Sequence, residues 1–314
     1  MEHIKFNNEL EFSDLVTIAK EILGSATLKN RVAEHSQGSV IGVSDGRYAA
    51  DQTLCFIDRS PTQEIIARIT KTFVITNKDI APVLASNGMI VVDDPRALFI
   101  DMLKRLQIDP GFSCFTSEVD VMTHIHPEAE VHTQTVIEEG VFIGSGTSIA
   151  AGCVIKKGAY IGNNVTIREN TVIGCDGIAL YKAHDGRVLC FPHLAGVIIE
   201  DDVEIGASCV LPRGVMTSSC IGQKTVIGNL SNLGHSVEIG SKVWMSVGCL
   251  IGGNTTIGES STLGLGVSLR DNLRIGSGCS IGMGAVVVRD VEDNSSVFGN
   301  PARKLRAISA GPER

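Results

Sequence analysis

One histidine stands in a setting that suits proton transfer. His235 follows Leu233 and Gly234 within the segment Asn229–Gly240, and Gly253 lies 18 residues further along the chain. An imidazole near its ordinary pKa of about 6.5 can take a proton from an attacking amine or hydroxyl at neutral pH. The unobstructed N–H of a glycine can stabilise the oxyanion that forms when a thioester is attacked. The two residues could therefore serve an attack on an acyl carbonyl, His235 by taking a proton and Gly253 by binding the oxyanion, although a lone histidine is more often structural.

The interval of 18 matters because apolar residues recur every six positions through more than half of the chain. Such runs extend from Ile125 to Ile173 and from Ile221 to Val287, with a shorter one from Ile199 to Leu211. No helix or ordinary strand has this period, whereas a three-sided parallel β-helix places one hexapeptide on each side of an 18-residue coil. The pattern resembles the left-handed β-helix of hexapeptide-repeat proteins. We therefore expect a mainly β fold with about eight coils and with His235 beside a corner.

Glycine and two interruptions mark the places where this solenoid must turn or open. Glycine follows the apolar position repeatedly, which predicts a tight turn at the end of each short strand. The period breaks from Cys175 to Gly196, and it slips by four residues between Leu211 and Val215. The first break predicts an excursion from the solenoid wall, and the second predicts an irregular corner.

The N-terminal third has no six-residue period. Its β-rich runs and helix-like stretches predict a small α/β domain: Thr53–Ile57, Phe73–Thr76 and Met89–Val92 for strands, and Ser13–Leu23, Pro61–Ile69 and Pro95–Leu106 for helices. The expected domains are an α/β sugar-nucleotide-binding domain at 1–106, a linker at 107–121, the β-helix at 122–291 with a loop insertion at 175–196, and a C-terminal tail at 292–314.

Composition narrows the class of protein. The 314 residues carry 27 Lys and Arg against 35 Asp and Glu, a formal charge of −8, and 43% are hydrophobic. These values fit about two folding units and exclude global disorder. The acidic balance argues against a nucleic-acid groove. Without a signal-like start or an 18-residue apolar run, a cytoplasmic location is expected. Nine cysteines without CxxC spacing predict free thiols.

Several motifs resemble one enzyme family over nearly the whole chain. They are Thr53–Phe56, Asp176–Gly177, Phe191–His193, Val197–Ala207, Arg213–Gly214 and Asn229–Gly240. This set resembles the UDP-3-O-acylglucosamine N-acyltransferase family of lipid A biosynthesis. The resemblance implies that His235 is the general base, that Gly253 supplies the oxyanion amide, and that Phe56 stacks on the nucleotide base. It also implies a homotrimer.

The chain departs from that family at four places. The family's second functional histidine, about two coils after the base, has no counterpart in Gly266–Asp271. An Asp seven residues before the base is replaced by Gly228, and a Tyr six residues beyond Phe56 is replaced by Thr62. The family also ends in a helical extension that engages acyl carrier protein, whereas ten residues follow Lys304 here.

The C-terminal segment Phe298–Lys304 resembles instead the Gly-x-Pro-Ala-Lys/Arg tail of acetyltransferases that use CoA. Cations held by a rigid Pro turn suit CoA phosphates, although a solvated basic end is the alternative. The predicted cofactor contacts are Gly284, Arg289, Pro301, Arg303 and Lys304. We therefore expect an N-acyltransferase that moves an acyl group from acyl-CoA to the amine of a dTDP- or UDP-linked amino sugar, resembling the enzymes that tailor sugars for O-antigen or capsule.

Six further residues are candidates for contact with the substrate. The predicted substrate contacts are Phe56, Arg59, Asp176, His193, Asn229 and Asn232. Arg59 could equally form a surface ion pair, and solvent exposure is the favoured interpretation for His184 and His193. His124, His126 and His132 have a metal-like spacing, but no Cys or carboxylate completes a set, so structural or surface roles and no metal are expected.

Two alternatives remain open. The first is the lipid A enzyme itself, with a hydroxyacyl carrier protein as donor, against which the different tail and the absent second histidine argue. The second is a non-catalytic solenoid that acts as a binding module, which predicts that His235→Ala leaves function unchanged.

Overall fold

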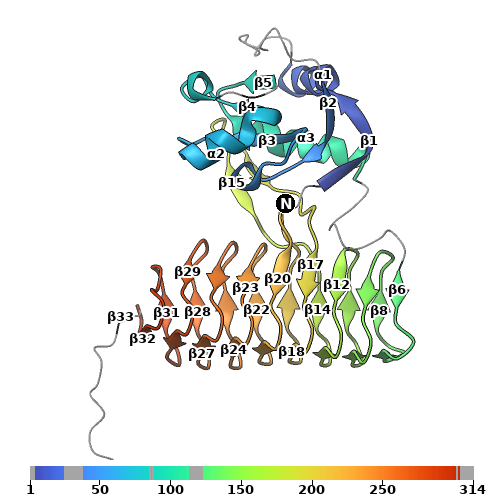
Figure 1. The fold of residues 1–314 in the computed structure, drawn as a ribbon, viewed down its shortest axis with the longest axis vertical. Coiled ribbons are helices and arrows are strands. Elements are labelled where there is room, and N and C mark those ends of the chain that lie inside the picture. The colour runs from blue at the N-terminus through green and yellow to red at the C-terminus, as the bar shows by residue number, and fades with distance from the viewer. Residues whose placement is uncertain are drawn as a thin grey trace, which may run out of the picture. The chain divides into compact units, whose positions relative to one another are not determined.

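The computed structural model describes residues 4–24, 38–84, 86, 88–112, 123–301 and 303–304 (Figure 1). The chain separates into two compact units. The first comprises residues 1–117, 178–195 and 215–217, and the second comprises residues 118–177, 196–214 and 218–314. The insertion in the six-residue period therefore supplies part of the first unit.

The first unit is built on a five-stranded sheet whose strand order follows the sequence. Its strands are β1 (Ile4–Glu11), β2 (Ser39–Val43), β3 (Thr53–Ile57), β4 (Phe73–Thr76) and β5 (Gly88–Val91). β1 runs antiparallel to β2, and the remaining neighbours are parallel. The three β-rich runs predicted from the sequence correspond to β3 at the centre of the sheet, β4 beside it and β5 at one edge. The sequence analysis predicted no strand at β1 or β2.

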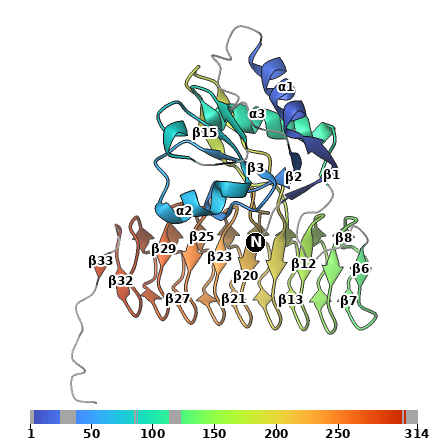
Figure 2. The ribbon, with the colours of Figure 1, turned by 45° about the horizontal axis from the view of Figure 1, so that its top comes forward.

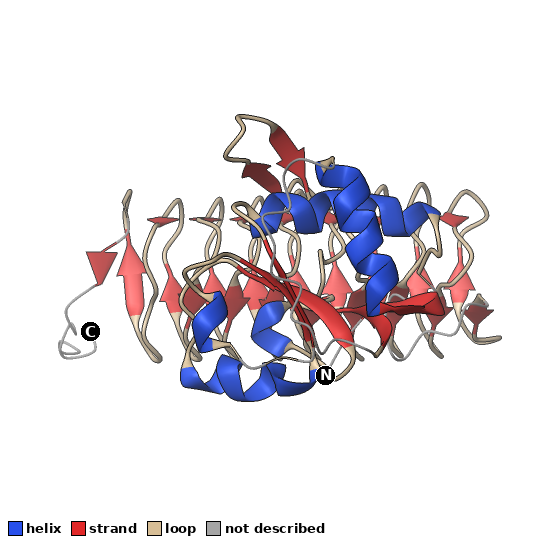
Figure 3. Ribbon diagram, turned by 90° about the horizontal axis from the view of Figure 1, so that it is seen from above, coloured by secondary structure: helices blue, strands red, loops and turns tan. Residues whose placement is uncertain are grey.

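Three α-helices cover the two faces of this sheet (Figure 3). They are α1 (Phe12–Leu23), α2 (Gln63–Arg68) and α3 (Pro95–Ile108), with short 3-10 helices at Gly46–Tyr48, Ile69–Lys71 and Ala81–Val83. Alternation along β3 separates the faces, because Leu54 is buried in the cluster of α1 and α3 while Cys55 is buried with Ile69. No helix in the described part of the chain is long and apolar enough to cross a bilayer.

The insertion is an antiparallel hairpin of β15 (Leu180–Lys182) and β16 (Val188–Cys190). Its Ala183 and Leu189 are buried together with Ala97 and Ile100 of α3. The excursion that the sequence predicts is therefore an ordered hairpin, and its apolar residues complete the surface of a helix far away in the sequence.

The second unit is a parallel β-helix with three sheets (Figure 2). The ten-stranded sheet contains β7 (Glu130–Val131), β10 (Ser148–Ile149), β13 (Thr166–Ile167), β18 (Glu204–Ile205), β21 (Val226–Ile227), β24 (Trp244–Met245), β27 (Thr262–Leu263), β30 (Ser280–Ile281), β32 (Ser296–Phe298) and β33 (Arg303–Lys304). The β8–β31 sheet contains β8 (Val136–Ile137), β11 (Val154–Ile155), β14 (Val172–Ile173), β19 (Val210–Leu211), β22 (Asn232–Leu233), β25 (Leu250–Ile251), β28 (Ser268–Leu269) and β31 (Val286–Val287). The β6–β29 sheet contains β6 (His124–Ile125), β9 (Phe142–Ile143), β12 (Ala159–Ile161), β17 (Val197–Ile199), β20 (Ser219–Ile221), β23 (Glu238–Ile239), β26 (Thr256–Ile257) and β29 (Arg274–Ile275).

The six-residue period places one apolar residue inside each side of the coil. Ile143, Ile161 and Leu233 are at most 1% exposed, and neighbouring coils align such residues directly, as Leu233 with Ile251. Ile125 is 42% exposed because β6 is the edge strand of its sheet. The mainly β solenoid with a small α/β unit, predicted from the period, is confirmed.

Most glycines that follow the apolar positions allow the backbones of neighbouring coils to approach closely. A Cβ on Gly234 would lie 2.2 Å from the backbone nitrogen of Gly253, too close for any side chain. The left-handed turn position falls two residues later, as at Ser236 with φ 53° and Asn254 with φ 55°. The sequence pattern therefore located the turns, but most of its glycines are required by contact with the next coil.

The solenoid extends beyond residue 291, where the sequence placed its end. Val291 and Val297 are buried and six residues apart, after a slip of four from Val287. β32 pairs in parallel with β30, and β33 folds back antiparallel to β32. Part of the expected tail is therefore strand.

Cysteines replace hydroxyl residues inside the turns. The Sγ of Cys153 donates to the carbonyl of Arg168 at 3.1 Å, as the Oγ1 of Thr147 donates to Gly162 at 2.7 Å. Each bond spans 15 residues and joins successive coils. The eight cysteines among the described residues are free, as their scattered spacing predicted.

Candidate active site

His235, Gly253 and Asp271 form a column at the corner between the β8–β31 and β6–β29 sheets. Leu233 pairs with Ile251, and the next coil continues the register, so residues two positions later lie above one another. Backbone hydrogen bonds link these corners in the same register: Asn254 N donates to the His235 carbonyl, and Asn272 N donates to the Gly253 carbonyl, both at 2.8 Å. The two predicted catalytic residues therefore lie on adjacent coils.

The imidazole of His235 covers Gly253. A Cβ placed on Gly253 would lie 2.7 Å from Nε2, 2.9 Å from Cε1 and 3.0 Å from Cδ2. Any other residue at 253 would displace the ring. Nδ1 is buried, while Nε2 is the ring nitrogen nearest to the Cβ position of Gly253, so Nε2 is the nitrogen that could exchange a proton with a ligand at this corner.

The Gly253 N–H is available to a ligand. It donates to no acceptor among the described residues. At the corresponding position three coils before His235 in the same sheet, Lys157 N donates to the Glu138 carboxylate at 3.0 Å. An unused amide beside a histidine nitrogen is the arrangement that oxyanion stabilisation requires.

Burial and one carboxylate set the charge of His235. Burial lowers the pKa of the imidazole, and the charge of Asp271 raises it, with a net lowering. The ring is therefore neutral at neutral pH and able to accept a proton. Asp271 had no role in the sequence interpretation, although its distance of 18 residues from Gly253 was a signal that could have found it.

The other candidate substrate contacts of the solenoid have separate surroundings. Asn229 Oδ1 accepts a hydrogen bond from Ala207 N at 2.8 Å, which gives it a structural role at another corner. Asn232 is exposed on β22. Asp176 Oδ1 lies 3.5 Å from Arg213 Nε, and the register places Arg213 one coil before His235.

The candidate cofactor contacts fall at three different places. Arg289 continues the column one coil beyond Asp271, is exposed, and makes no hydrogen bond or ion pair with any described residue. Gly284 lies at the turn between β30 and β31, where its N–H donates to the Leu265 carbonyl at 2.8 Å. Pro301, Arg303 and Lys304 belong to the terminal hairpin, where Lys304 Nζ lies 2.8 Å from a Glu292 carboxylate oxygen. Ala302 of the same motif lies outside the described residues.

Phe56 of the first unit is already in contact with aromatic and cationic groups. Its ring centroid lies 5.0 Å from that of Phe99 and 6.1 Å from that of Phe191. The Arg96 guanidinium lies 5.4 Å from the Phe56 centroid and 5.0 Å from that of Tyr181. Arg96, which the sequence motifs did not reveal, also pairs with Asp58 (side-chain N···O 2.7 Å).

Arg59 and His193 have contrasting surroundings in the first unit. Arg59 is exposed without a hydrogen bond or ion pair to the described residues. His193 is 6% exposed, so the solvent-exposed interpretation was wrong for this residue, while the His184 side chain is 68% exposed. The difference arises because His193 follows the hairpin, where the chain returns through buried Leu194 and Ala195.

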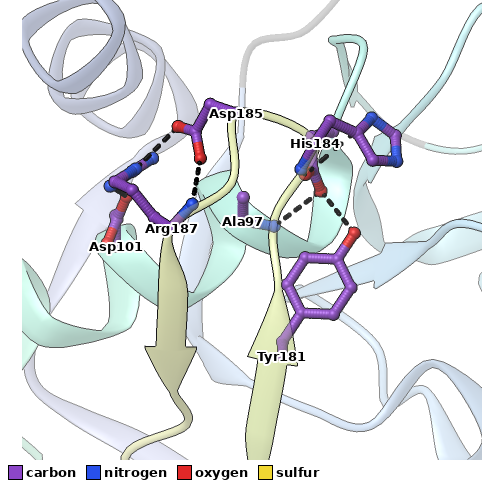
Figure 4. A network of polar contacts seen from close by, with 7 residues as sticks. Ala97, Asp101, Tyr181, His184, Asp185 and Arg187 are labelled. Carbon is purple, nitrogen blue, oxygen red and sulfur yellow. Dashed lines mark hydrogen bonds and ion pairs between the residues drawn. The ribbon is translucent and has the colours of Figure 1, made fainter.

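A carboxylate fastens the hairpin to α3 (Figure 4). Asp94 caps the helix by accepting from Ala97 N at 3.0 Å, and it also accepts from the Tyr181 hydroxyl at 2.9 Å and from His184 N at 2.8 Å. Arg187 adds a 3.0 Å ion pair to Asp101. These polar contacts and the apolar cluster fix the hairpin as part of the first unit.

The three histidines with metal-like spacing have other partners. His126 Nδ1 accepts from Glu128 N, and His132 Nδ1 accepts from Gln134 N, each at 3.2 Å. The His124 ring stacks on Phe142 with centroids 5.0 Å apart. Within the described ranges, no group of three or more His, Cys, Asp or Glu side chains could hold a metal ion.

Comparison with known families locates the repeats. The model of the bacterial transferase hexapeptide (six repeats) matches residues 135–175, and that of the hexapeptide repeat of succinyl-transferase matches residues 248–289. The chain carries transferase hexapeptide repeats. The second match includes Gly253 and Asp271 of the column.

Two relatives place the repeats among acyltransferases. The chain is 28% identical over 181 residues to a Coxiella burnetii UDP-3-O-acylglucosamine N-acyltransferase, covering 51% of this chain and 53% of the relative. It is 43% identical over 72 residues to a Francisella tularensis protein of the same name, covering 23% and 21%. The chain is thus homologous to N-acyltransferases, and its match with the first spans about half of that relative's length.

A solved structure gives a weaker likeness. The Francisella novicida UDP-N-acetylglucosamine acyltransferase is 23% identical, covers 59% of this chain and 68% of its own, and has a TM-score of 0.49. The enzyme of the same kind from Bacteroides fragilis is 20% identical, with coverage of 60% and 73% and a TM-score of 0.46.

Proposed function

We propose that the chain is an N-acyltransferase that transfers an acyl group from acyl-CoA to the amine of a dTDP- or UDP-linked amino sugar for O-antigen or capsule synthesis. The observation that carries the proposal is the His235 ring over Gly253, whose N–H donates to no acceptor in the described part of the chain. Homology to N-acyltransferases supports the reaction class.

The geometry supports a direct attack. The acceptor amine attacks the thioester carbonyl carbon while His235 Nε2 takes a proton from its nitrogen. The Gly253 N–H donates to the oxyanion of the tetrahedral intermediate. When the C–S bond breaks, the imidazolium returns the proton to the departing thiolate. The products are an amide and free CoA, and no acyl-enzyme is needed.

The binding roles of the remaining residues are part of the proposal. Phe56 of the first unit would contribute to nucleotide-base binding, and the cation of Arg96 beside it would favour an electron-rich or anionic ligand. Arg289 and Arg303 are candidate contacts for CoA phosphates. Lys304 is a weaker candidate than these two arginines, because its ammonium group already forms an ion pair with Glu292. A homotrimer and a cytoplasmic location stay predictions.

A second candidate is UDP-3-O-acylglucosamine N-acyltransferase activity with a hydroxyacyl carrier protein as donor. The names of both sequence relatives favour it. The stretch Gly266–Asp271 holds no counterpart of the second histidine that the family resemblance leads one to expect, and this difference favours another acceptor.

A substrate panel tests the two candidates. Purified full-length protein is incubated with UDP-glucosamine, dTDP-linked amino sugars and 3-O-acylated UDP-glucosamine, each with short acyl-CoAs and with hydroxyacyl carrier protein, and products are read by mass spectrometry. Acylation of a small amino sugar from CoA is expected. Reaction only with the acylated precursor and carrier protein would establish the second candidate. No product from any pair, with His235→Ala unchanged in every assay, would favour a binding module.

A further inference from the structure

Asp271 lies at the corner column beyond Gly253 and forms no ion pair with a charged group among the residues that the structure describes. It is exposed and occupies the column position beyond Gly253, whose carbonyl accepts from Asn272 N at 2.8 Å. A Cβ on Gly252 would lie 2.3 Å from Asp271 N, so the two coils are in tight contact at this corner. Asp271 forms no ion pair with any described residue, Arg289 of the next coil included.

A chain of side-chain amides orients this carboxylate. Asn272 Nδ2 donates to Asp271 Oδ2 at 2.5 Å, and Asn254 Nδ2 donates to Asn272 Oδ1 at 3.2 Å. Both asparagines occupy left-handed turn positions, with φ 55° and 58°, which brings them together on successive coils. One carboxylate oxygen is thereby held by protein, while Oδ1 accepts no hydrogen bond from the described residues.

We propose that Asp271 is the residue that selects an amine acceptor: its free carboxylate oxygen binds the acceptor's ammonium group on the same corner column as His235 and Gly253. The proposal deepens the proposed function and rests on it for the identity of the reacting group. An ammonium presents several N–H donors to a carboxylate, and such charge-assisted bonds are strong, whereas a sugar hydroxyl presents one neutral donor.

In the proposed reaction, the acceptor nitrogen loses two protons as it changes from an ammonium group to an amide. The bound ammonium releases one proton to solvent and becomes a neutral amine that remains hydrogen-bonded to Asp271. As the C–N bond forms, His235 Nε2 takes the second proton, and it passes that proton to the thiolate when the C–S bond breaks. Asp271 holds the nucleophile beside the base and undergoes no net change.

Ligand binding tests the proposal independently of turnover. The probes are UDP-glucosamine and UDP-glucose, which differ by an amine or a hydroxyl at one carbon, or the equivalent pair for another amino sugar that the wild type acylates faster. Wild-type protein is expected to bind the amine about 10- to 100-fold more tightly by calorimetry. Asp271→Asn is expected to lose this preference.

Kinetics give the matching readout. Asp271→Asn should raise the KM for the acceptor by a similar factor and leave the KM for acyl-CoA within about twofold. Glu259→Gln is the matched control, because it removes one exposed carboxylate from another corner of the same solenoid. Unchanged thermal midpoints in both variants exclude a folding defect.

The two proposals fail in different ways. If the panel shows acylation but Asp271→Asn keeps both the amine preference and the acceptor KM, Asp271 does not select the acceptor and the proposed function stands. If no donor and acceptor react but the amine preference disappears in Asp271→Asn, the binding role stands and the proposed function fails. Equal binding of both probes by the wild type overturns the selection role directly.

Discussion

The imidazole of His235 occupies the space where a side chain at Gly253 would begin, with Nε2 2.7 Å from the absent Cβ. The ring and the glycine belong to successive coils, and the Asn254 N–H bonded to the His235 carbonyl holds those coils in register. The repeat itself thereby places the proposed base and the proposed amide donor side by side. The requirement for glycine at 253 is steric, because any residue except proline would supply the same N–H but every other side chain would meet the ring.

Gly253→Ala keeps the backbone N–H but is expected to lower kcat by roughly 10²-fold, the loss that a small misplacement of a catalytic group can cause. The added methyl must push the ring aside, because its carbon would lie within 3.0 Å of three ring atoms. Steady-state rates with saturating donor and acceptor measure the effect.

The double variant His235→Ala/Gly253→Ala tests whether the loss of activity in Gly253→Ala comes from displacement of the His235 ring or from a distorted backbone in the coil. Without the imidazole, the methyl no longer meets those atoms, so the second substitution should add little to the loss caused by His235→Ala. Fully multiplicative losses would show that the methyl acts through something other than the ring.

Removal of the base itself should be severe. His235→Ala is expected to reduce kcat/KM by roughly 10²- to 10⁴-fold, since proton transfer from the amine then depends on water. A reduction of less than about tenfold in the panel assay would rule out the general-base role. The binding-module alternative predicts no change in ligand affinity.

The pH dependence follows from the two influences on His235. Burial lowers its pKa, so the acid limb of kcat/KM should lie below the ordinary value of about 6.5. The negative charge of Asp271 favours the imidazolium and raises this pKa, so Asp271→Asn should move the acid limb to still lower pH. A rate profile from pH 5 to 8 checks the direction. Movement to higher pH in this variant would contradict the electrostatic link between the two residues.

The six-residue period predicted the solenoid and the corner position of His235 because each coil repeats the same inward positions. Ile143, Ile161 and Leu233 satisfy the same steric requirement on different coils, so one pattern specifies all of them. The same reasoning connects residues 18 apart, which is why His235 and Gly253 could be paired from the sequence. Asp271 lies on the same interval of 18 residues, but the interval alone assigns no chemistry to the residue that occupies it.

Contacts outside the repeat could not be obtained in this way. The Tyr181 hydroxyl reaches Asp94 across 87 residues, and no local pattern links the two segments. Arg96 beside Phe56 likewise depends on the packing of α3 against β3. The Lys304–Glu292 ion pair depends on β33 folding back antiparallel to β32. The sequence analysis placed no strand in this segment and so could not predict the pair.

Two adjacent residues of β23 test the division between core and wall. Ile239 is 3% exposed, while Glu238 points outward and is exposed. Ile239→Ala should destabilise the solenoid by about 2–4 kcal/mol, because it removes buried methyl groups and leaves a cavity. Glu238→Ala should change stability by about 0.5 kcal/mol or less. Denaturant unfolding of full-length protein measures both, and equal midpoints would contradict the inward orientation of Ile239.

Asp94 is the final residue with a testable structural role, because three donors from α3 and the hairpin converge on it. Asp94→Ala should destabilise the first unit by about 2–4 kcal/mol, from the lost helix cap and two hydrogen bonds. Asp93→Ala, at an exposed neighbouring carboxylate, is the control. Burial acts to raise the pKa of Asp94, but hydrogen bonds from His184 N, Ala97 N and the Tyr181 hydroxyl outweigh it and lower that pKa. The stabilisation is therefore present above the unfolded value of about 3.9 and is lost as the pH falls through the lower folded value. Denaturant midpoints should differ between the two variants at pH 7 and converge in acid, and identical midpoints at pH 7 would refute the role of Asp94.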